Sequence, residues 1–222
     1  SFASLADTAT LTATVKDSGG AVMSGVTVSW TTSAASVATV SSAGLVTSVA
    51  DGTATVTATF GVLAATTSVT VAQVAASVTL SPTTVNFASL ADTATLTATV
   101  KDANDSTMPG ATVSWATSAA SVATVSSAGL VTSVADGTAT ITATSGALEA
   151  TAAVTVAQAA ANIELSDTVV TFASLADTTQ LTATVKDAKD NVISGAAVTW
   201  ATSAASVATV SSTGLVTSVG DG

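Results

Sequence analysis

The sequence predicts an all-β protein built from tandem β-sandwiches, and three observations carry this prediction. The segment FASLADT begins at Phe2, Phe87 and Phe172, so successive copies lie 85 residues apart. Short segments alternate apolar and polar residues, which is the period of half-buried strands. Turn residues return about every 8–12 residues and no segment has helical periodicity. An 85-residue repeat can bury its own core, so we expect an array of small domains.

The period divides the chain into three predicted domains. Repeat 1 (residues 1–72) lacks a first strand, repeat 2 (73–157) is complete, and repeat 3 (158–222) lacks its last strands. The segment VTVAQAAANIEL (154–165) passes from one repeat to the next without a linker rich in Gly, Pro or Ser. We therefore expect closely abutted domains arranged as a fairly stiff rod.

Alternation predicts three strands in the first half of repeat 2. The third of them places Val113 and Trp115 inward, because the large apolar ring of a tryptophan belongs between two sheets. The loop KDANDSTMPG precedes this strand and contains Pro109 and Gly110, which favour turns. The three expected strands are ASVTL (76–80), ATLTATV (94–100) and ATVSW (111–115).

The second half of repeat 2 predicts one hairpin and two further strands. The hairpin has the four-residue connection SSAG, in which Gly129 supplies the positive φ that closes the turn. Asp51, Asp136 and Asp221 stand before glycines in the next turn of each repeat, where we expect Asx-type turns. The expected strands are VATV (122–125), LVTSV (130–134), TATITAT (138–144) and EATAAVTV (149–156).

The composition excludes several classes of partner. Only 8% of the residues are charged, against about 25% in a typical domain. The net charge is −10, with 14 acidic residues against 4 lysines, which argues against binding nucleic acid or anionic lipid. Thr or Ser interrupts nearly every apolar stretch, so we expect no membrane insertion in this segment. The fold has no cysteine and hence no disulfide.

The expected strand faces are unusually neutral. Their outward positions are mostly Thr, Ser and Ala rather than Lys and Glu. Such faces lack the charges that normally keep strands from pairing with neighbouring molecules. We therefore hypothesise that the chain self-associates, with lateral packing into filaments.

Catalysis has few candidate residues. The chain has no histidine or cysteine, and a hydroxyl nucleophile needs a positioned base. Glu149 and Glu164 are the only glutamates, and neither falls at an equivalent position in the other repeats. We expect no catalytic residue, no cofactor-binding residue and no enzymatic activity.

Oxygen-bearing side chains gather in one loop of repeats 2 and 3. Hard oxygen ligands in a loop can hold Ca²⁺. The equivalent loop of repeat 1, KDSGGAVMSG, offers only Asp17, whereas a rod stiffened by calcium needs a site at every junction. We favour solvated turns over calcium sites and assign no metal ligand. The residues concerned are Asp102, Asn104 and Asp105 in repeat 2, and Asp187, Asp190 and Asn191 in repeat 3.

The segment VSWATSAASVATVSSAGLVTSVADGTATITAT of repeat 2 resembles the group 2 bacterial immunoglobulin-like domain family. The family pattern is Trp-x-Ser, V-A-x-V, G-x-V-T and G-T-A-x-I/V-T-A. Thr117 stands where the family usually has Ser and keeps the hydroxyl. The resemblance implies an immunoglobulin-like sandwich. The matching residues are Trp115, Val122, Ala123, Val125, Gly129, Val131, Thr132, Gly137, Thr138, Ala139, Ile141, Thr142 and Ala143.

The resemblance also implies a class of function. Domains of this family occur in tandem in surface proteins similar to intimins and invasins, and in phage structural proteins, as stalks or adhesive modules. We therefore expect an extracellular structural protein, a stalk or fibre subunit of a bacterial cell surface or secreted fibre, whose partners are neighbouring immunoglobulin-like domains. The alternative is an adhesin or phage-particle module that contacts a glycan or host receptor. That alternative needs exposed aromatics, and Phe60 is the only one outside the repeat-equivalent positions.

Overall fold

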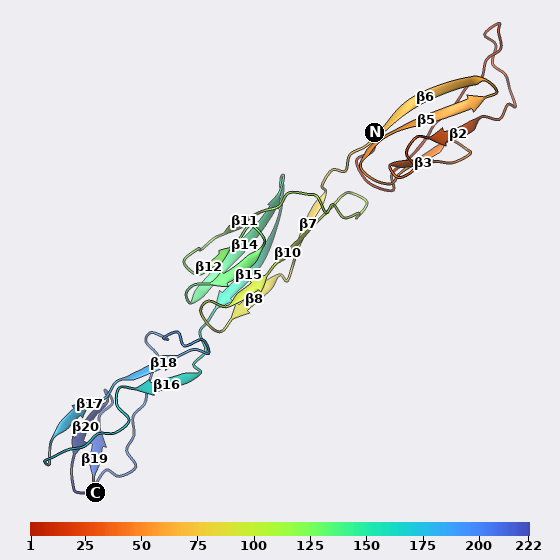
Figure 1. Cartoon of the computed structure of the whole chain (residues 1–222). Helices are drawn as coiled ribbons and strands as arrows, with labels where there is room; N and C mark the ends of the chain where they lie inside the picture. Colours follow the sequence, from red (N-terminus) through yellow and green to blue (C-terminus); the bar gives the residue numbers. More distant parts are fainter. The chain divides into compact units, whose positions relative to one another are not determined.

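The computed structural model describes residues 1–222 and consists of strands and loops without a helix (Figure 1). The chain divides into two compact units, and the division runs through repeat 2. Unit 1 comprises Ser1–Ser81, Thr97–Trp115 and Thr142–Thr151, and unit 2 comprises Pro82–Leu96, Ala116–Ile141 and Ala152–Gly222. No element is a helix of the length and apolarity that a membrane crossing requires. The domain boundaries and the rod arrangement stay predictions.

Repeat 1, in unit 1, is a sandwich of two three-stranded sheets. Its core joins Ala38 and Val46 of one sheet to Ala54, Val56 and Val69 of the other. This confirms the prediction of an all-β sandwich, because alternate side chains of both sheets meet in one apolar layer. The sheets have the orders β1(Thr8–Thr10)–β4(Leu45–Ser48)–β3(Ala38–Val40) and β2(Ser29–Thr32)–β5(Gly52–Phe60)–β6(Leu63–Val71).

Repeat 2 contains the predicted strands with adjusted bounds. The hairpin around SSAG is confirmed: β12 and β13 pair in antiparallel register, and Gly129 has a φ of 78°. The strands are β7(Ser77–Ser81), β8(Thr84–Phe87), β9(Thr93–Thr95), β10(Thr97–Lys101), β11(Ser114–Thr117), β12(Ala123–Val125), β13(Leu130–Ser133), β14(Gly137–Ser145) and β15(Leu148–Val156).

The prediction of one strand over residues 94–100 is wrong. Strand β9 pairs with β13, whereas β10 pairs with β7, and Leu96 lies between them. Leu96 is fully buried, and its amide donates to the carbonyl of Gly129 at 2.9 Å. The alternation continues through Leu96, so the sequence gives no sign that the hydrogen-bonding partner changes there.

Two other strands differ from the prediction. The expected strand at 111–115 lies at 114–117, and its Val113 and Trp115 are half-buried. Strand β8 was not expected at all. It pairs in parallel with β15, placing Val85 beside Val154 and Phe87 beside Val156. A four-residue strand whose partner comes about 70 residues later leaves no local pattern of a hairpin.

Repeat 3, in unit 2, forms two small sheets. Strand β16 pairs with β18, and β20 lies between β17 and β19. The same hairpin recurs in β19 and β20. The strands are β16(Asn162–Leu165), β17(Thr178–Gln180), β18(Ala183–Lys186), β19(Ala208–Val210) and β20(Leu215–Ser218).

Each tryptophan of repeats 1 and 3 lies against a glycine. Trp30 is half-buried and packs against the core of repeat 1. Gly44 has a φ of 79°, and a Cβ there would lie 2.5 Å from the carbonyl oxygen of Leu11 and 3.1 Å from the Trp30 ring. Both the backbone conformation and the space therefore require glycine. The tryptophan is placed inward as predicted, but its ring is not fully covered.

Candidate functional site

A buried carboxylate of repeat 2 binds the end of repeat 1, within unit 1. The Oδ2 atom of Asp102 accepts hydrogen bonds from the amide of Leu5 at 2.8 Å and from the side-chain Nε2 of Gln73 at 2.9 Å. Asp102 is only 2% exposed. We call this arrangement joint 1. The loop that carries Asp102 is the KD loop of repeat 2 (residues 101–110), and its counterparts in repeats 1 and 3 are residues 16–25 and 186–195.

The KD loop holds the same carboxylate from its other side. The Oδ1 atom of Asp102 accepts from the amides of Asn104 at 3.0 Å and Ser106 at 2.9 Å. Burial by itself raises the pKa of Asp102, but the bonds from Gln73, Leu5 and the loop amides lower it by more, so the pKa lies below its ordinary value of 3.8. Four N–H donors therefore hold one ionised carboxylate.

Unit 2 contains the same arrangement between repeats 2 and 3, which we call joint 2. The Oδ2 atom of Asp187 accepts from the amide of Leu90 and from the Nε2 of Gln158, both at 3.0 Å. Its Oδ1 accepts from the amides of Lys189 at 2.8 Å and Asn191 at 3.0 Å. Asp187 is 1% exposed, and these bonds outweigh its burial and hold its pKa far below the ordinary value.

The Leu amide of each joint belongs to a strained loop with the sequence SLAD (residues 4–7, 89–92 and 174–177). In repeat 2 the central Ala91 has a φ of 58°, a conformation that costs an alanine about 1–2 kcal/mol. The buried hydroxyl of Ser133 donates to the carbonyl of Ser89 at 2.8 Å, and the amide of Ala91 donates to the carbonyl of Ser133 at 3.1 Å. Ser133 thus clamps the loop that presents the Leu90 amide.

The same clamp recurs in the other repeats. The hydroxyl of Ser48 donates to the carbonyl of Ser4 at 2.8 Å, and that of Ser218 donates to the carbonyl of Ser174 at 2.7 Å. The central alanine has a positive φ in all three copies. The SLAD loop therefore has the same conformation in all three repeats.

The glutamine of each joint is held at both ends. The amide of Gln73 donates to the Oδ1 of Asp51 at 2.8 Å, and the amide of Gln158 donates to Asp136 at 2.8 Å. The expected Asx-type turns at these two aspartates are therefore wrong, since each carboxylate binds a residue 22 positions away. Asp51 and Asp136 fix the segment that connects one repeat to the next.

The structure separates only Asp105 and Asp190 from the other oxygen-bearing residues that the sequence grouped as a calcium alternative. Asp102 faces the preceding repeat, whereas Asp105 is exposed and lies 3.9 Å from the ammonium of Lys101. Asp190 is likewise exposed. No group of three or more carboxylate, histidine or cysteine side chains converges in a way that could hold a metal ion.

Asp17 is the equivalent aspartate in the loop of repeat 1 (residues 16–25). Its Oδ1 accepts from the amides of Gly19 and Ala21, both at 2.9 Å, which is the pattern of the other two loops. The side chain is exposed. The bonds from the loop amides to the carboxylate are therefore common to all three loops.

The joints were not predicted from the sequence, although their residues recur in successive repeats. Gln73 and Gln158, and the serines Ser48 and Ser133, are polar residues at equivalent places of successive repeats. Their recurrence at the 85-residue period was the available signal. The two candidate glutamates take no part: Glu149 is exposed, and Glu164 pairs with Lys186 at 2.7 Å.

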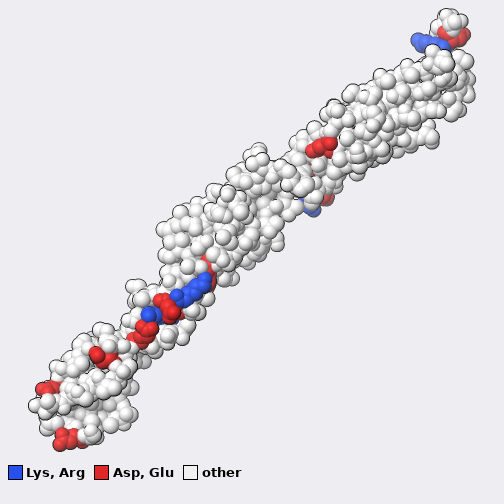
Figure 2. Space-filling view, in the orientation of Figure 1, with Lys and Arg blue, Asp and Glu red and all other residues white.

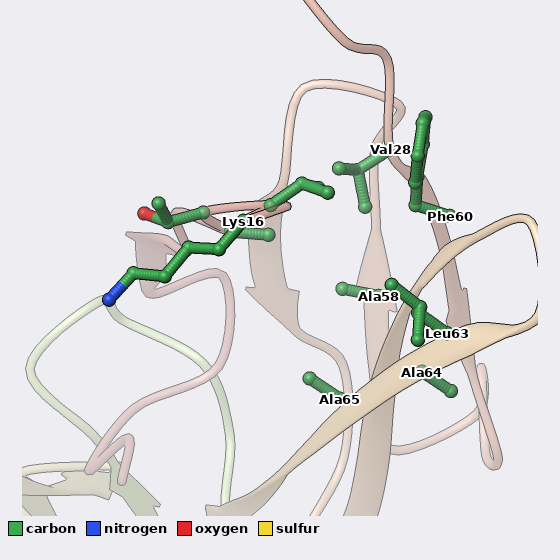
Figure 3. Close-up of a pocket in the computed structure, with 10 residues that line it drawn as sticks. Lys16, Val28, Ala58, Phe60, Leu63, Ala64 and Ala65 are labelled. Atoms are coloured by element: carbon green, nitrogen blue, oxygen red, sulfur yellow. The ribbon is translucent and has the colours of Figure 1, made fainter. Parts of the chain in front are cut away.

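Two hollows of the surface lack the features of a ligand site, one because it is small and the other because no aromatic side chain lines it. Phe60 and Leu63 border a pocket of about 130 Å³, in which the ammonium of Lys16 points away from the apolar side chains (Figure 3). Pockets for small ligands usually have about 300–1,000 Å³. A cleft of about 530 Å³ beside joint 1 is lined by Leu5, Gln73 and residues 107–111, with no aromatic side chain.

A third hollow, of about 650 Å³, lies inside repeat 3 between Phe172 and Val216. The equivalent residues of repeat 2, Phe87 and Val131, are buried in the core. This hollow is therefore an uncovered part of the sandwich interior.

Charged side chains are sparse over the surface. Figure 2 shows Lys, Asp and Glu side chains at a few places, with large uncharged areas between them. The strand surfaces agree with this view, since the exposed residues of β6 are Ala, Thr and Ser apart from Leu63. The buried carboxylates of Asp102 and Asp187 are therefore among a small number of charges in the chain.

Comparisons with known proteins agree with this fold. The chain matches the bacterial Ig-like domain (group 2) family over residues 74–156 and 159–222, and a bacterial Ig-like domain family over residues 26–73. No curated protein sequence matches it.

Several solved structures are similar. Domains 1–6 of the surface layer protein SbsC are 28% identical, over 83% of this chain and 27% of that chain, with a TM-score of 0.39. Invasin, a bacterial integrin-binding protein, is 21% identical, over 82% and 43% of the two chains, with a TM-score of 0.47. The Escherichia coli adhesin FdeC is 21% identical, over 82% and 69%, with a TM-score of 0.40. The chain thus spans about a quarter of the SbsC fragment's length.

The family matches cover repeats 2 and 3 and most of repeat 1, and they include the Trp, Gly and hairpin residues that carried the resemblance. The all-β sandwich agrees with them. The chain belongs to the group 2 bacterial immunoglobulin-like domain family.

Proposed function

We propose that this chain is a non-catalytic structural segment of a bacterial surface protein, a stalk or filament subunit whose repeats are held to one another by the two joints. One observation carries the proposal: an Asp carboxylate binds a Leu amide 97 residues earlier at both joints. In a spacer built from repeats, the same contact must be able to form between every pair of neighbouring repeats.

The chemistry of the joint suits a mechanical spacer. Bonds to an ionised carboxylate are about twice as strong as bonds between neutral groups. Each repeat also carries both halves of the contact, the KD loop and the SLAD loop, so that a duplicated repeat brings its own connection. The resulting joint restricts motion between neighbouring domains, which by default move freely when their interface is small.

The neutral strand faces support a filament as one form of this function. Exposed strands that carry Thr, Ser and Ala can approach a second copy without burying a charge. The exposed apolar residues Leu45, Leu130 and Leu215 recur at equivalent positions and add to such a face. Localisation at the cell surface or in a secreted fibre follows from this role.

The adhesive alternative has less support. A glycan site needs exposed aromatic faces, and the three tryptophans are half-buried. Phe60 is half-buried beside a pocket that is too small for a sugar ring system. We therefore rank binding to a glycan or receptor below the structural role.

Electron microscopy of the native bacterial envelope tests the proposal, with the chain marked by a gold-conjugated antibody. Label on isolated projections supports the stalk, and label on regular filaments or sheets supports the filament. Label confined to the cell interior, or to phage particles, contradicts a role at the bacterial surface.

A further inference from the structure

We infer that two side chains of the KD loop set how firmly each joint holds, and that joint 2 is loosened by salt whereas joint 1 is not. This inference rests on the proposed role of the joints as connections between repeats. The two positions lie two and four residues after the joint aspartate. They are Gly19 and Ala21 in repeat 1, Asn104 and Ser106 in repeat 2, and Lys189 and Asn191 in repeat 3.

Joint 1 is completed by a neutral side chain. The Nδ2 of Asn104 donates to the carbonyl of Leu5 at 2.8 Å and to the Oδ1 of Asp7 at 2.9 Å. Asp7 and Asp102 are the only charges in these contacts, and both accept from neutral N–H donors. Short-range bonds of this kind depend little on ionic strength, because no pair of opposite charges is screened.

Joint 2 makes the equivalent contacts with a charge. The ammonium of Lys189 lies 2.8 Å from the Oδ1 of Asp92, which occupies the place of Asp7, and donates to the carbonyl of Ala91 at 2.8 Å. The Nδ2 of Asn191 donates to the carbonyl of Leu90 at 3.2 Å, which is the bond that Asn104 makes to Leu5 in joint 1. The same two acceptors of the SLAD loop are thus satisfied by different residues.

The ion pair of joint 2 is open to solvent. The side chain of Lys189 is 46% exposed and that of Asp92 is 31% exposed. Counter-ions reach a pair of this kind, and its contribution falls as salt is added. The KD loop of repeat 1 has neither side chain, so it offers a partner only the carboxylate of Asp17. The KD loops of repeats 2 and 3 therefore make the same contact without and with an ion pair.

Amide hydrogen exchange of the full chain measures each joint separately. The amide of Leu5 reports joint 1 and that of Leu90 reports joint 2, because each is protected by its bond to the joint aspartate. On raising NaCl from about 0.02 M to about 0.5 M, we expect the protection of Leu90 to fall about twofold to fivefold. The protection of Leu5 should stay constant, as should that of the core amide of Val131.

Exchanging the side chains between the joints makes the test reciprocal. Lys189→Asn should remove the salt dependence at Leu90, and Asn104→Lys should confer it on Leu5 through Asp7. Lys186→Gln is the matched control. It removes an equal positive charge only three residues before Lys189, but that charge is paired with Glu164 inside repeat 3. The salt dependence at Leu90 should survive in this control.

The inference is overturned if Leu5 and Leu90 respond equally to salt in the native chain. It is also overturned if Lys189→Asn keeps the full salt response at Leu90 while Val131 shows an intact repeat 2. Either result leaves the spacer role standing, because that role is tested by imaging the cell envelope. A failed imaging test would in turn leave the exchange measurements unchanged.

Discussion

The main-chain amide of Leu90 donates a 3.0 Å hydrogen bond to the carboxylate of Asp187, which lies 97 residues further along the chain. Leu5 and Asp102 stand in the same relation at 2.8 Å, with the same separation. The first pair lies in unit 2 and the second in unit 1. One contact therefore connects each repeat to the next, and it depends on a carboxylate that stays ionised while buried.

Replacing the joint carboxylate by an amide should open its joint. In Asp187→Asn, the new NH₂ group competes with the N–H donors of Leu90 and Gln158, which need an acceptor. We expect hydrogen exchange at Leu90 to accelerate on the order of tenfold, with Leu5 unchanged. Asp190→Asn is the control, because that side chain is exposed in the same loop. Equal exchange at Leu90 in the two variants would refute the role of Asp187.

Acid should loosen the joints, and joint 1 first. The pKa of Asp102 is lower in the folded chain than its ordinary value of 3.8, so the unfolded or open form binds the proton more readily. The stabilisation is therefore complete above about pH 4 and is lost as the pH falls through the folded pKa. The pKa of Asp187 is held lower still, so joint 2 persists to stronger acid. A ¹³C NMR titration of both carboxyl carbons measures the order, and the reverse order would contradict the prediction.

Removing the serine clamp should destabilise the SLAD loop. In Ser133→Ala the buried carbonyl of Ser89 loses its hydroxyl donor, and an unsatisfied buried acceptor costs about 1–3 kcal/mol. Denaturant unfolding monitored by the NMR signals of repeat 2 measures this loss. Ser127→Ala, in an exposed turn, should change the free energy of unfolding by less than about 0.5 kcal/mol. Equal effects of the two substitutions would contradict the clamp.

Glycine at the centre of the SLAD loop should stabilise it. Ala91 has a φ of 58°, so Ala91→Gly relieves backbone strain, and we expect a gain of about 0.5–1 kcal/mol. Ala94→Gly, in the extended strand β9, should instead cost about 0.5–1 kcal/mol. The same unfolding measurement applies to both. A loss of stability in Ala91→Gly would show that the loop is not strained at this residue.

Two glycines of repeat 1 separate backbone strain from steric clash. Gly20 has a φ of 87° with no atom near its missing Cβ, whereas Gly44 combines a φ of 79° with a Leu11 carbonyl 2.5 Å away. Gly20→Ala should cost about 1–2 kcal/mol, which is the backbone term alone. Gly44→Ala should lower the free energy of unfolding by clearly more, because the new methyl group forces the hairpin or the Trp30 ring to move. Thermal unfolding of repeat 1 measures both, and equal losses would contradict the close contact at Trp30.

Local features of the sequence were enough to predict the local structure. The 85-residue period revealed the repeats, and SSAG with Gly129 specified a hairpin, because turn chemistry acts over neighbouring residues. Alternation likewise located the long strands of repeat 2, since burial of one sheet face imposes a period of two. The family resemblance at Trp115 and the following residues rested on the same short segments.

What only the tertiary structure decided was which distant segments meet. The change of partner at Leu96, the parallel pairing of β8 with β15, and the bond from Leu90 to Asp187 all join residues far apart in sequence. Alternation within one segment does not specify such contacts, because each depends on which other segment of the chain the fold brings beside it. Thus the sequence by itself determined a chain of repeated β-sandwiches, and the tertiary structure showed that its few buried charges connect one repeat to the next.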